Sequence, residues 1–78
     1  MPKIPKISGN QMTRYLQRKG FVVTRRKGSH LTLRKESIFT TVPAGNKMLS
    51  IGTQHCILSD VSITRDEFSS DYENGLIK

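Results

Sequence analysis

The sequence contains a single cysteine and no tryptophan, and it has no hydrophobic run long enough to cross a membrane. Because Cys56 has no second cysteine to pair with, an internal disulfide and a cysteine-based zinc site are both excluded. Residues 1–6 mix proline, lysine and isoleucine and lack the apolar stretch of a secretory signal. These features predict a cytoplasmic protein in a reducing compartment, with no membrane association.

Acidic residues are absent from residues 1–35, which contain ten lysines and arginines. Residues 36–78 contain three basic and six acidic residues, so the formal charge is +10 in the first part and −3 in the second. A domain with one strongly basic half is typical of proteins that bind a polyanion, most often nucleic acid. A basic surface that only keeps a small protein soluble is the alternative.

The length of 78 residues, with 35% hydrophobic and 24% charged residues, predicts one small globular domain and excludes a second. We expect residues 1–78 to form this domain, with its core at about 8–68. Residues 69–78 are mostly polar and contain Asn74-Gly75, which predicts a flexible tail.

Caps and apolar spacing predict the order helix, three strands, helix. Ser8 and Gln11 match a capping box, and Met12, Tyr15 and Leu16 recur at helical spacing after it. We expect a helix at about 9–19, strands at about 21–26, 30–34 and 38–42, a helix that begins near residue 50 or 52, and one helical turn from residue 64. This is an α+β fold with a three-stranded antiparallel sheet and a short C-terminal helix. Its α-β-β-β-α layout is that of a double-stranded-RNA-binding domain, with both main helices on one face of the sheet.

The segment Lys27-Gly28-Ser29-His30 separates two runs of β-branched, apolar and long side chains, which is typical of a hairpin turn. Side chains alternate along a strand, so His30, Thr32 and Arg34 share one face, and the leucines on either side of Thr32 share the other. If the leucines are buried, His30 faces solvent among cations. An imidazole can exchange a proton near neutral pH, which suits proton transfer beside a polyanion.

The same alternation predicts which side chains of the other elements face the core. In the third strand we expect Ile38 and Val42 to point inward, which leaves Phe39 near the open face of the sheet. In the second helix we expect Cys56 to be a small core residue.

Arg25 and Arg26 are neighbours on the first strand, so only one of them can share the face of His30. We expect that residue to be Arg25, because the strand twists before it reaches the turn.

Several short motifs resemble those of the HicA family of toxins. They are Gly20-Phe21, Lys27-Gly28-Ser29-His30, Val42-Pro43 with Gly45-Asn46-Lys47, Gly52-Thr53, Ile57-Leu58 and Thr64-Arg65-Asp66-Glu67-Phe68. The resemblance covers about residues 8–68. It implies a double-stranded-RNA-binding-like fold, cleavage of messenger RNA, neutralisation by a HicB-like antitoxin, and a catalytic role for His30.

RNA can be cut without a metal when a base takes the proton of a 2′-hydroxyl and cations stabilise the charge that develops on the phosphate. His30 is the candidate base, and the backbone N–H groups of Gly28 and Ser29 can also bind a phosphate, because glycine allows a close approach. The candidate RNA-binding residues are Arg25, Arg26, Lys27, Gly28, Ser29, Arg34 and Lys47.

We expect neither a metal nor a small-molecule cofactor. Nucleases with two metal ions need converging carboxylates, whereas all six acids follow residue 35, and adjacent Asp66 and Glu67 point apart on a helix. His30 and His55 have no further ligands at metal-binding spacing. His55 is an alternative candidate for the acid that protonates the leaving oxygen.

A second function class is an RNA- or DNA-binding module of the same fold without catalysis. We expect a module of this kind to grip duplex RNA through lysines at the start of its last main helix, by contacts to phosphates. Residues 50–56 contain no lysine, which counts against a module that only binds duplex RNA. DNA binding by the basic face stays open.

Overall fold

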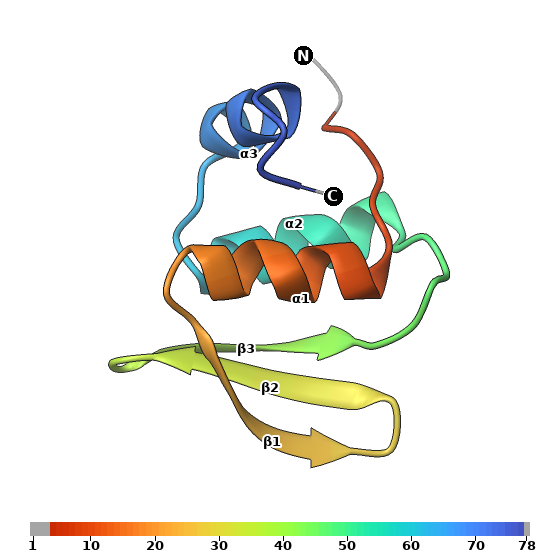
Figure 1. Ribbon diagram of the computed structural model, residues 1–78, viewed down its shortest axis with the longest axis vertical. Helices are drawn as coiled ribbons and strands as arrows, with labels where there is room; N and C mark the ends of the chain where they lie inside the picture. The colour runs from red at the N-terminus through yellow and green to blue at the C-terminus, as the bar shows by residue number, and fades with distance from the viewer. Residues whose placement is uncertain (1–3, 78) are drawn as a thin grey trace.

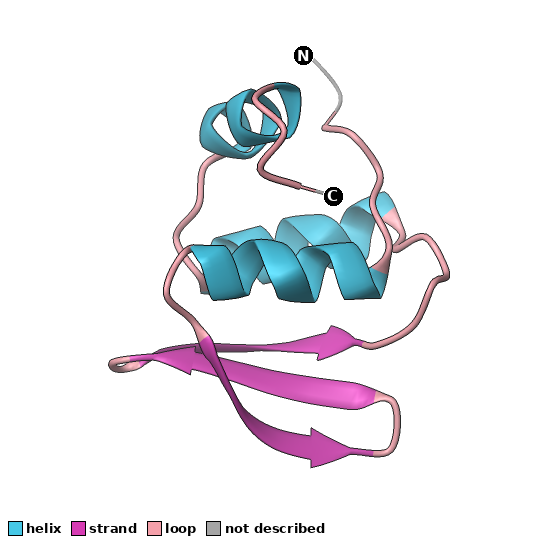
Figure 2. Cartoon of the chain, viewed as in Figure 1, coloured by secondary structure: helices cyan, strands magenta, loops and turns pink. Residues whose placement is uncertain are grey.

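Six elements follow one another along residues 4–77, the part of the chain that the computed structural model describes. They are α1 (Gly9–Arg18), β1 (Val22–Lys27), β2 (His30–Lys35), β3 (Ile38–Pro43), α2 (Ile51–Asp60) and α3 (Arg65–Glu73). The strands form one antiparallel sheet in the order β1-β2-β3, as Figure 2 shows, so each strand pairs with its neighbour in sequence. The predicted α+β fold with a three-stranded antiparallel sheet is confirmed.

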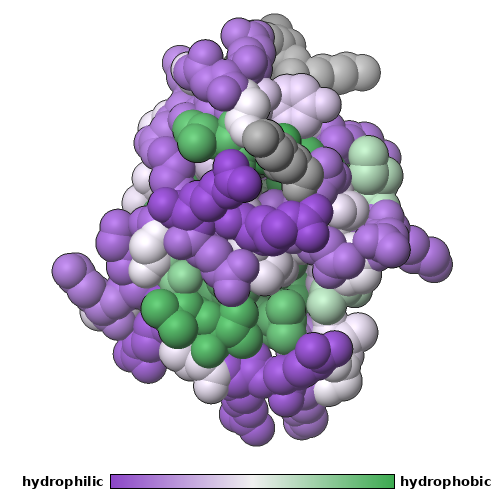
Figure 3. All heavy atoms as spheres, in the orientation of Figure 1, coloured by the Kyte–Doolittle hydropathy of each residue, from purple (hydrophilic) through white to green (hydrophobic). Residues whose placement is uncertain are grey.

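The two longest helices lie on the same side of the sheet (Figure 1). α1 packs against β1 and β3, and α2 packs against β3. No other element of residues 4–77 covers the opposite side of the sheet (Figure 1). Figure 3 shows a mostly hydrophilic surface, with an apolar area between α1 and the sheet where the two layers meet. The sheet therefore has one face in the core and one face in solvent, as the order of elements predicts.

α1 begins with the predicted capping box. The Ser8 hydroxyl accepts a hydrogen bond from the Gln11 backbone N–H at 3.1 Å, and the Gln11 side chain accepts one from the Ser8 N–H at 2.8 Å. The predicted stripe of Met12, Tyr15 and Leu16 is fully buried, with each residue at most 1% exposed. Local sequence therefore determines both where this helix starts and which side of it is buried.

The segment that precedes α1 is held against α2 by Gln54, whose side chain is completely buried. Its Oε1 accepts a hydrogen bond from the Ile7 N–H at 2.8 Å, and its Nε2 donates one to the Pro5 carbonyl at 2.8 Å. The Leu49 N–H also donates to the Ile7 carbonyl at 2.8 Å. This role of Gln54 could not be predicted from the sequence, because a polar residue in a helix ordinarily lies on the solvent side.

Cys56 is exposed, so the prediction that it belongs to the core is wrong. The buried residues of α2 are Gln54, Ile57 and Leu58, which recur at helical spacing. Adjacent residues on a helix diverge by about 100°, so Cys56 points away from the stripe that contains Ile57. The polar Gln54 therefore occupies a core position of α2 in which a hydrophobic residue would be expected.

α3 is longer than the single turn predicted from its Thr64 cap, because it continues to Glu73. Residues expected to form a flexible tail pack on the domain, since Asp71 and Ile77 are 9% and 7% exposed. Arg18 Nη1 also donates to the Leu76 carbonyl at 3.3 Å. Lys78, the end of that predicted tail, lies outside the described residues.

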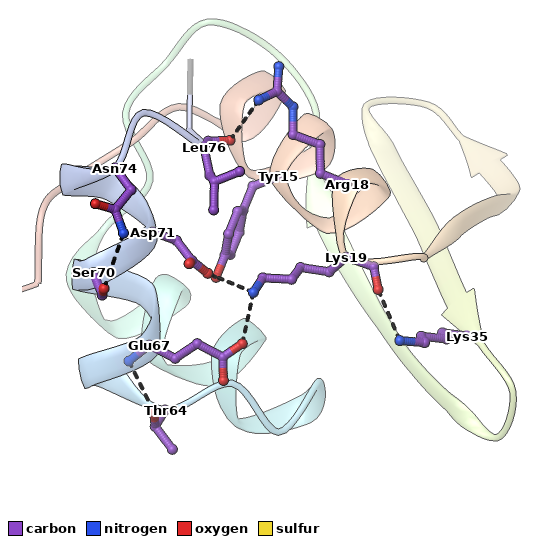
Figure 4. A network of polar contacts seen from close by, with 10 residues as sticks. All are labelled: Tyr15, Arg18, Lys19, Lys35, Thr64, Glu67, Ser70, Asp71, Asn74 and Leu76. Atoms are coloured by element: carbon purple, nitrogen blue, oxygen red, sulfur yellow. Dashed lines mark hydrogen bonds and ion pairs between the residues drawn. The ribbon is translucent and has the colours of Figure 1, made fainter.

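A buried polar contact explains why this polar segment packs (Figure 4). The Tyr15 hydroxyl donates to Asp71 Oδ2 at 2.7 Å, and Lys19 Nζ lies 2.7 Å from the same oxygen and 2.9 Å from Glu67 Oε2. Burial alone would raise the pKa of Asp71, but hydrogen bonds from Lys19 and Tyr15 outweigh it and hold the pKa below its ordinary value. The hydrogen bonds to Asp71 and Glu67 raise the pKa of Lys19. α3 is thereby fixed to the C-terminal end of α1.

Candidate functional site

The turn between β1 and β2 places His30 at the corner of a hairpin, as predicted. Gly28 in this turn has φ +58°, a left-handed conformation that glycine adopts at little cost. His30 is the first residue of β2 and lies between Lys27 on β1 and Pro43 on β3. Residues paired across antiparallel strands share a face, so the exposed imidazole lies beside the Lys27 side chain.

The sheet surface that turns away from the helices is called the open face below. Strand pairing and exposure assign to it Val22, Arg25, Lys27, His30, Thr32, Arg34, Phe39, Thr41 and Pro43. None of these residues is acidic, and three carry a positive charge. The predicted alternation is confirmed, because Leu33 and Val42 on the other face are completely buried whereas Phe39 is 58% exposed. The open face is thus a basic surface with one histidine at its corner.

A β-bulge at Thr24 interrupts the pairing of β1 with β2. Val23 pairs with Leu33 and Arg25 pairs with Thr32, so Thr24 is an extra residue between two paired positions. An extra residue reverses the alternation of side chains beyond it. Arg25 therefore points to the open face even though Val23, two residues earlier, points to the core.

The bulge decides which of two adjacent arginines can act with His30. Arg25 lies on the open face, as predicted, whereas Arg26 pairs with Leu31 and lies on the opposite face. The bulge, and not the twist of the strand, turns Arg25 to this face. Of the predicted RNA-binding residues on β1 and β2, the structure brings Arg25, Lys27 and Arg34 onto the surface that carries His30, and it does not bring Arg26 there.

The loop after β3 lies at the same end of the molecule as the hairpin corner (Figure 1). The Ala44 N–H donates to the Ser29 carbonyl, which joins this loop to the turn. The loop carries Lys47, which is exposed, as are Gly28 and Ser29. The backbone of Lys47, a predicted RNA-binding residue, therefore lies at the same end of the domain as His30.

Asn10 in the first turn of α1 holds this loop in place, a role that could not be predicted from the sequence. Its Oδ1 accepts a hydrogen bond from the Gly45 N–H at 3.0 Å, and its Nδ2 donates to Asn46 Oδ1 at 2.9 Å. Its own N–H donates to the Gly45 carbonyl at 3.0 Å. Asn10 and Gly45 are 35 residues apart, so local pattern cannot reveal the contact.

α1 begins in close contact with the end of β3. A Cβ atom built on Gly9 would lie 1.7 Å from the Pro43 carbonyl oxygen, so a larger residue cannot occupy this position without a backbone shift. Because Pro43 pairs with His30, the start of α1 supports the strand end beside the histidine.

At the far end of the open face, Arg34 lies between Val22 and Phe39. Its Nε donates to the Glu36 carbonyl at 2.9 Å, and its guanidinium carbon lies 5.9 Å from the centre of the Phe39 ring. Val22 and Phe39 are 62% and 58% exposed. This end of the face therefore combines a positioned cation with apolar surface.

The His30 side chain makes no hydrogen bond or ion pair with any residue in the described range 4–77. His55, the alternative proton donor, lies on α2 on the other side of the sheet, so the fold does not bring the two histidines together (Figure 1). The hairpin corner therefore presents the His30 imidazole, which is not engaged by another described residue, beside the Lys27 ammonium group. These groups can accept a proton and stabilise negative charge on a phosphate.

Residues 4–77 contain no group of three or more histidine, cysteine, aspartate or glutamate side chains placed to hold a metal ion. No helix of this same part of the chain has the length and apolar character needed to span a bilayer. No pocket is found on the surface of the described residues.

Comparison with protein families gives a match over residues 9–63 to the family described as HicA toxin of bacterial toxin-antitoxin. The match spans well over half of the chain, from the first residue of α1 through the sheet and α2. The segment that forms α3 lies beyond it. The comparison with curated proteins gives no match.

Proposed function

Because the chain belongs to the HicA toxin family and so is the toxin of a toxin-antitoxin pair, we propose that it is a metal-independent endoribonuclease that cleaves messenger RNA with His30 as its base. The observation that carries this proposal is the exposed imidazole at the corner of a basic, acid-free sheet face. The family match supports the toxin role, and the chemistry of the corner supports the reaction.

In the proposed reaction, His30 takes the proton of a ribose 2′-hydroxyl. The 2′-oxygen attacks the adjacent phosphorus, the bond from phosphorus to the 5′-oxygen breaks, and the leaving oxygen takes a proton from water. The hydroxide that remains takes the proton from His30, which returns the imidazole to its neutral form. The products end in a 2′,3′-cyclic phosphate and a 5′-hydroxyl. Lys27, paired with His30, stabilises the charge that develops on the phosphate. A Cβ at Gly28 would meet no atom within 4 Å, so the backbone of the turn is accessible to that phosphate.

Arg25, Arg34 and Lys47 are the proposed contacts that hold the RNA strand. All three are exposed, and the two arginines lie on the open face with His30. Contacts between cations and phosphates fix the position of a strand without reading its sequence. The proposed substrate is messenger RNA, which places the activity in the cytoplasm.

The direct test is cleavage of RNA by His30→Ala, with His55→Ala as the matched control. Loss of a general base lowers a rate by about 10²- to 10⁴-fold, so His30→Ala should be nearly inactive. Both histidines are exposed, so both variants should keep the circular dichroism spectrum and melting temperature of the parent. Cleavage should persist in excess EDTA and leave cyclic-phosphate or 3′-phosphate ends.

A His30→Ala protein that cuts RNA at a rate comparable to the parent would refute the assignment. Products that end in a 3′-hydroxyl and form only with Mg²⁺ would refute the metal-independent mechanism. If the parent chain binds RNA or DNA tightly but cuts neither, the non-catalytic binding module is the correct interpretation.

We also propose that a HicB-like antitoxin neutralises the toxin by covering the open face. The charge of +10 in residues 1–35 suits an acidic partner, which would repel RNA from the surface and block His30 sterically. In the complex, hydrogen exchange should slow in residues 27–34. Protection confined to α3 would contradict this mode of neutralisation.

A further inference from the structure

Phe39 is the only aromatic residue among those that form the open face, and it is 58% exposed. It lies on β3, opposite Arg34 on β2 and on the side of the sheet away from α1 and α2. Single exposed hydrophobic residues are common on proteins and need no explanation by themselves. What distinguishes this one is its position on a surface whose charged residues are all cations.

The Arg34 guanidinium is held close to the Phe39 ring. Its guanidinium lies 5.9 Å from the ring centre, and its Nε is held by the Glu36 carbonyl at 2.9 Å. Glu36 is an acid near this end of the face, but it lies in the turn between β2 and β3 and contributes its backbone oxygen. Because the guanidinium lies over one face of the ring, a base would stack on the other face while its phosphate binds the cation. Proteins bind single-stranded nucleic acid by this combination of bases stacked on rings and phosphates bound by cations.

The ring lies along the same strands as the histidine. The pair of Phe39 and Arg34 and the pair of Pro43 and His30 are four residues apart on β2 and β3, which is roughly 13 Å along the sheet. A short single-stranded segment spans this distance. Arg25 pairs with Thr32 between the two positions, so a cation is available along the path.

We propose that Phe39 is a stacking platform for one base of a single-stranded RNA whose backbone runs along the open face to His30. The inference rests on the proposed function, because it takes the bound polymer to be the substrate. By holding one base at a fixed distance from the histidine, Phe39 positions the strand and determines which phosphate reaches the corner. Bases inside a duplex are already stacked and cannot use the ring, so the platform selects single strands.

The experiment uses the full chain with His30→Ala, so that RNA is bound without being cut. A set of single-stranded oligoribonucleotides carries the fluorescent base 2-aminopurine at successive positions. Stacking on Phe39 should quench the fluorophore at one position, and Phe39→Ala should abolish that quenching. Phe39→Ala and Phe39→Leu should each weaken binding by about 5- to 150-fold, whereas Phe39→Tyr should retain it.

Val22→Ala is the matched control, because Val22 is 62% exposed on the same face and lacks a ring. It should change RNA affinity by less than about twofold, since only an aromatic ring stacks with a base. Phe39 is uncharged, so its replacement should leave the salt dependence of binding unchanged.

The outcomes separate this inference from the proposed function. If RNA binds with a salt-dependent affinity and Phe39→Ala behaves like Val22→Ala, the stacking inference is overturned and the proposed function stands. If Phe39→Ala weakens only the binding of the antitoxin, the ring belongs to a protein interface and the inference is again overturned. If the chain with His30 intact neither binds nor cuts RNA, the proposed function fails and the inference fails with it.

Discussion

Arg25 and Arg26 provide a matched pair for testing which surface binds RNA. They are adjacent, equally charged and both exposed, yet the bulge at Thr24 turns them to opposite faces of the sheet. Each phosphate contact to a single strand contributes about −0.7 to the slope of log K against log salt concentration. Arg25→Ala should therefore make the slope shallower by about 0.7, and Arg26→Ala should leave it unchanged.

The size of the effect follows from the cations on the open face. If Arg25, Lys27 and Arg34 each touch one phosphate, the slope is about −2.1, and affinity falls about 18-fold between about 50 and 200 mM salt. Without Arg25 the slope is about −1.4, and the fall is about 7-fold. A further contact from Lys47 would make every slope steeper by the same amount and leave the difference between the variants unaltered.

Fluorescence anisotropy of a labelled single-stranded oligoribonucleotide, titrated at several salt concentrations, measures these slopes. The measurement uses the His30→Ala background in all three proteins, so that cleavage does not remove the ligand. Equal and unchanged slopes for both arginine variants would show that β1 is not part of the RNA surface. A shallower slope for Arg26→Ala alone would show that RNA binds on the face that carries Leu31.

Two further predictions concern stability. Gln54→Leu should lower the free energy of unfolding by about 1–3 kcal/mol for each polar group left unpaired, because two backbone groups lose their partner. Urea denaturation measures this loss, and a value below about 0.5 kcal/mol would contradict the account. The pKa of Asp71 is lower in the folded protein than in the unfolded chain, so its contribution is present above about pH 4 and is lost as the pH falls through the folded pKa. Asp71→Asn should therefore flatten the decline of stability in acid, and an unchanged decline would show that hydrogen bonds from Tyr15 and Lys19 do not stabilise the carboxylate.

The elements with strong local signals could be predicted from the sequence. The capping box at Ser8 and the apolar stripe after it set α1, and the glycine turn at Gly28 sets the hairpin. Alternation along β2 then places His30 on the solvent side, because the leucines beside it supply enough apolar surface to fix the buried face. The histidine corner was accessible to sequence reasoning for this reason.

Features that depend on distant partners could not be predicted in the same way. Gln54 is buried where it binds two backbone groups of the N-terminal segment, and Cys56, two residues further along α2, is exposed on the other side of the helix. α3 extends beyond one turn, and its buried Asp71 receives a hydrogen bond from Tyr15, 56 residues earlier. Nothing in the composition of the predicted tail indicates that contact.

The β-bulge at Thr24 was not predicted, although its effect on Arg25 was. Arg25 lies on the predicted face, but strict alternation from the half-buried, core-facing Val23 would have put it on the wrong one. Neither Thr24 nor its neighbours in β1 include a glycine or another residue typical of a bulge. The extra residue can therefore be identified only when the register with β2 is known.

The contact between Gly9 and Pro43 has a consequence for the way cells escape this toxin. A cell that expresses a toxin without its antitoxin survives when a mutation disables the protein, and the proposed mechanism predicts replacements of His30 as one route. Gly9 offers a second one, since even a methyl group there would clash with a carbonyl oxygen and push α1 away from the strand end beside the histidine. Survivors of such a selection should therefore include Gly9→Ala, a loss of function at a residue with no functional group to contribute to the reaction.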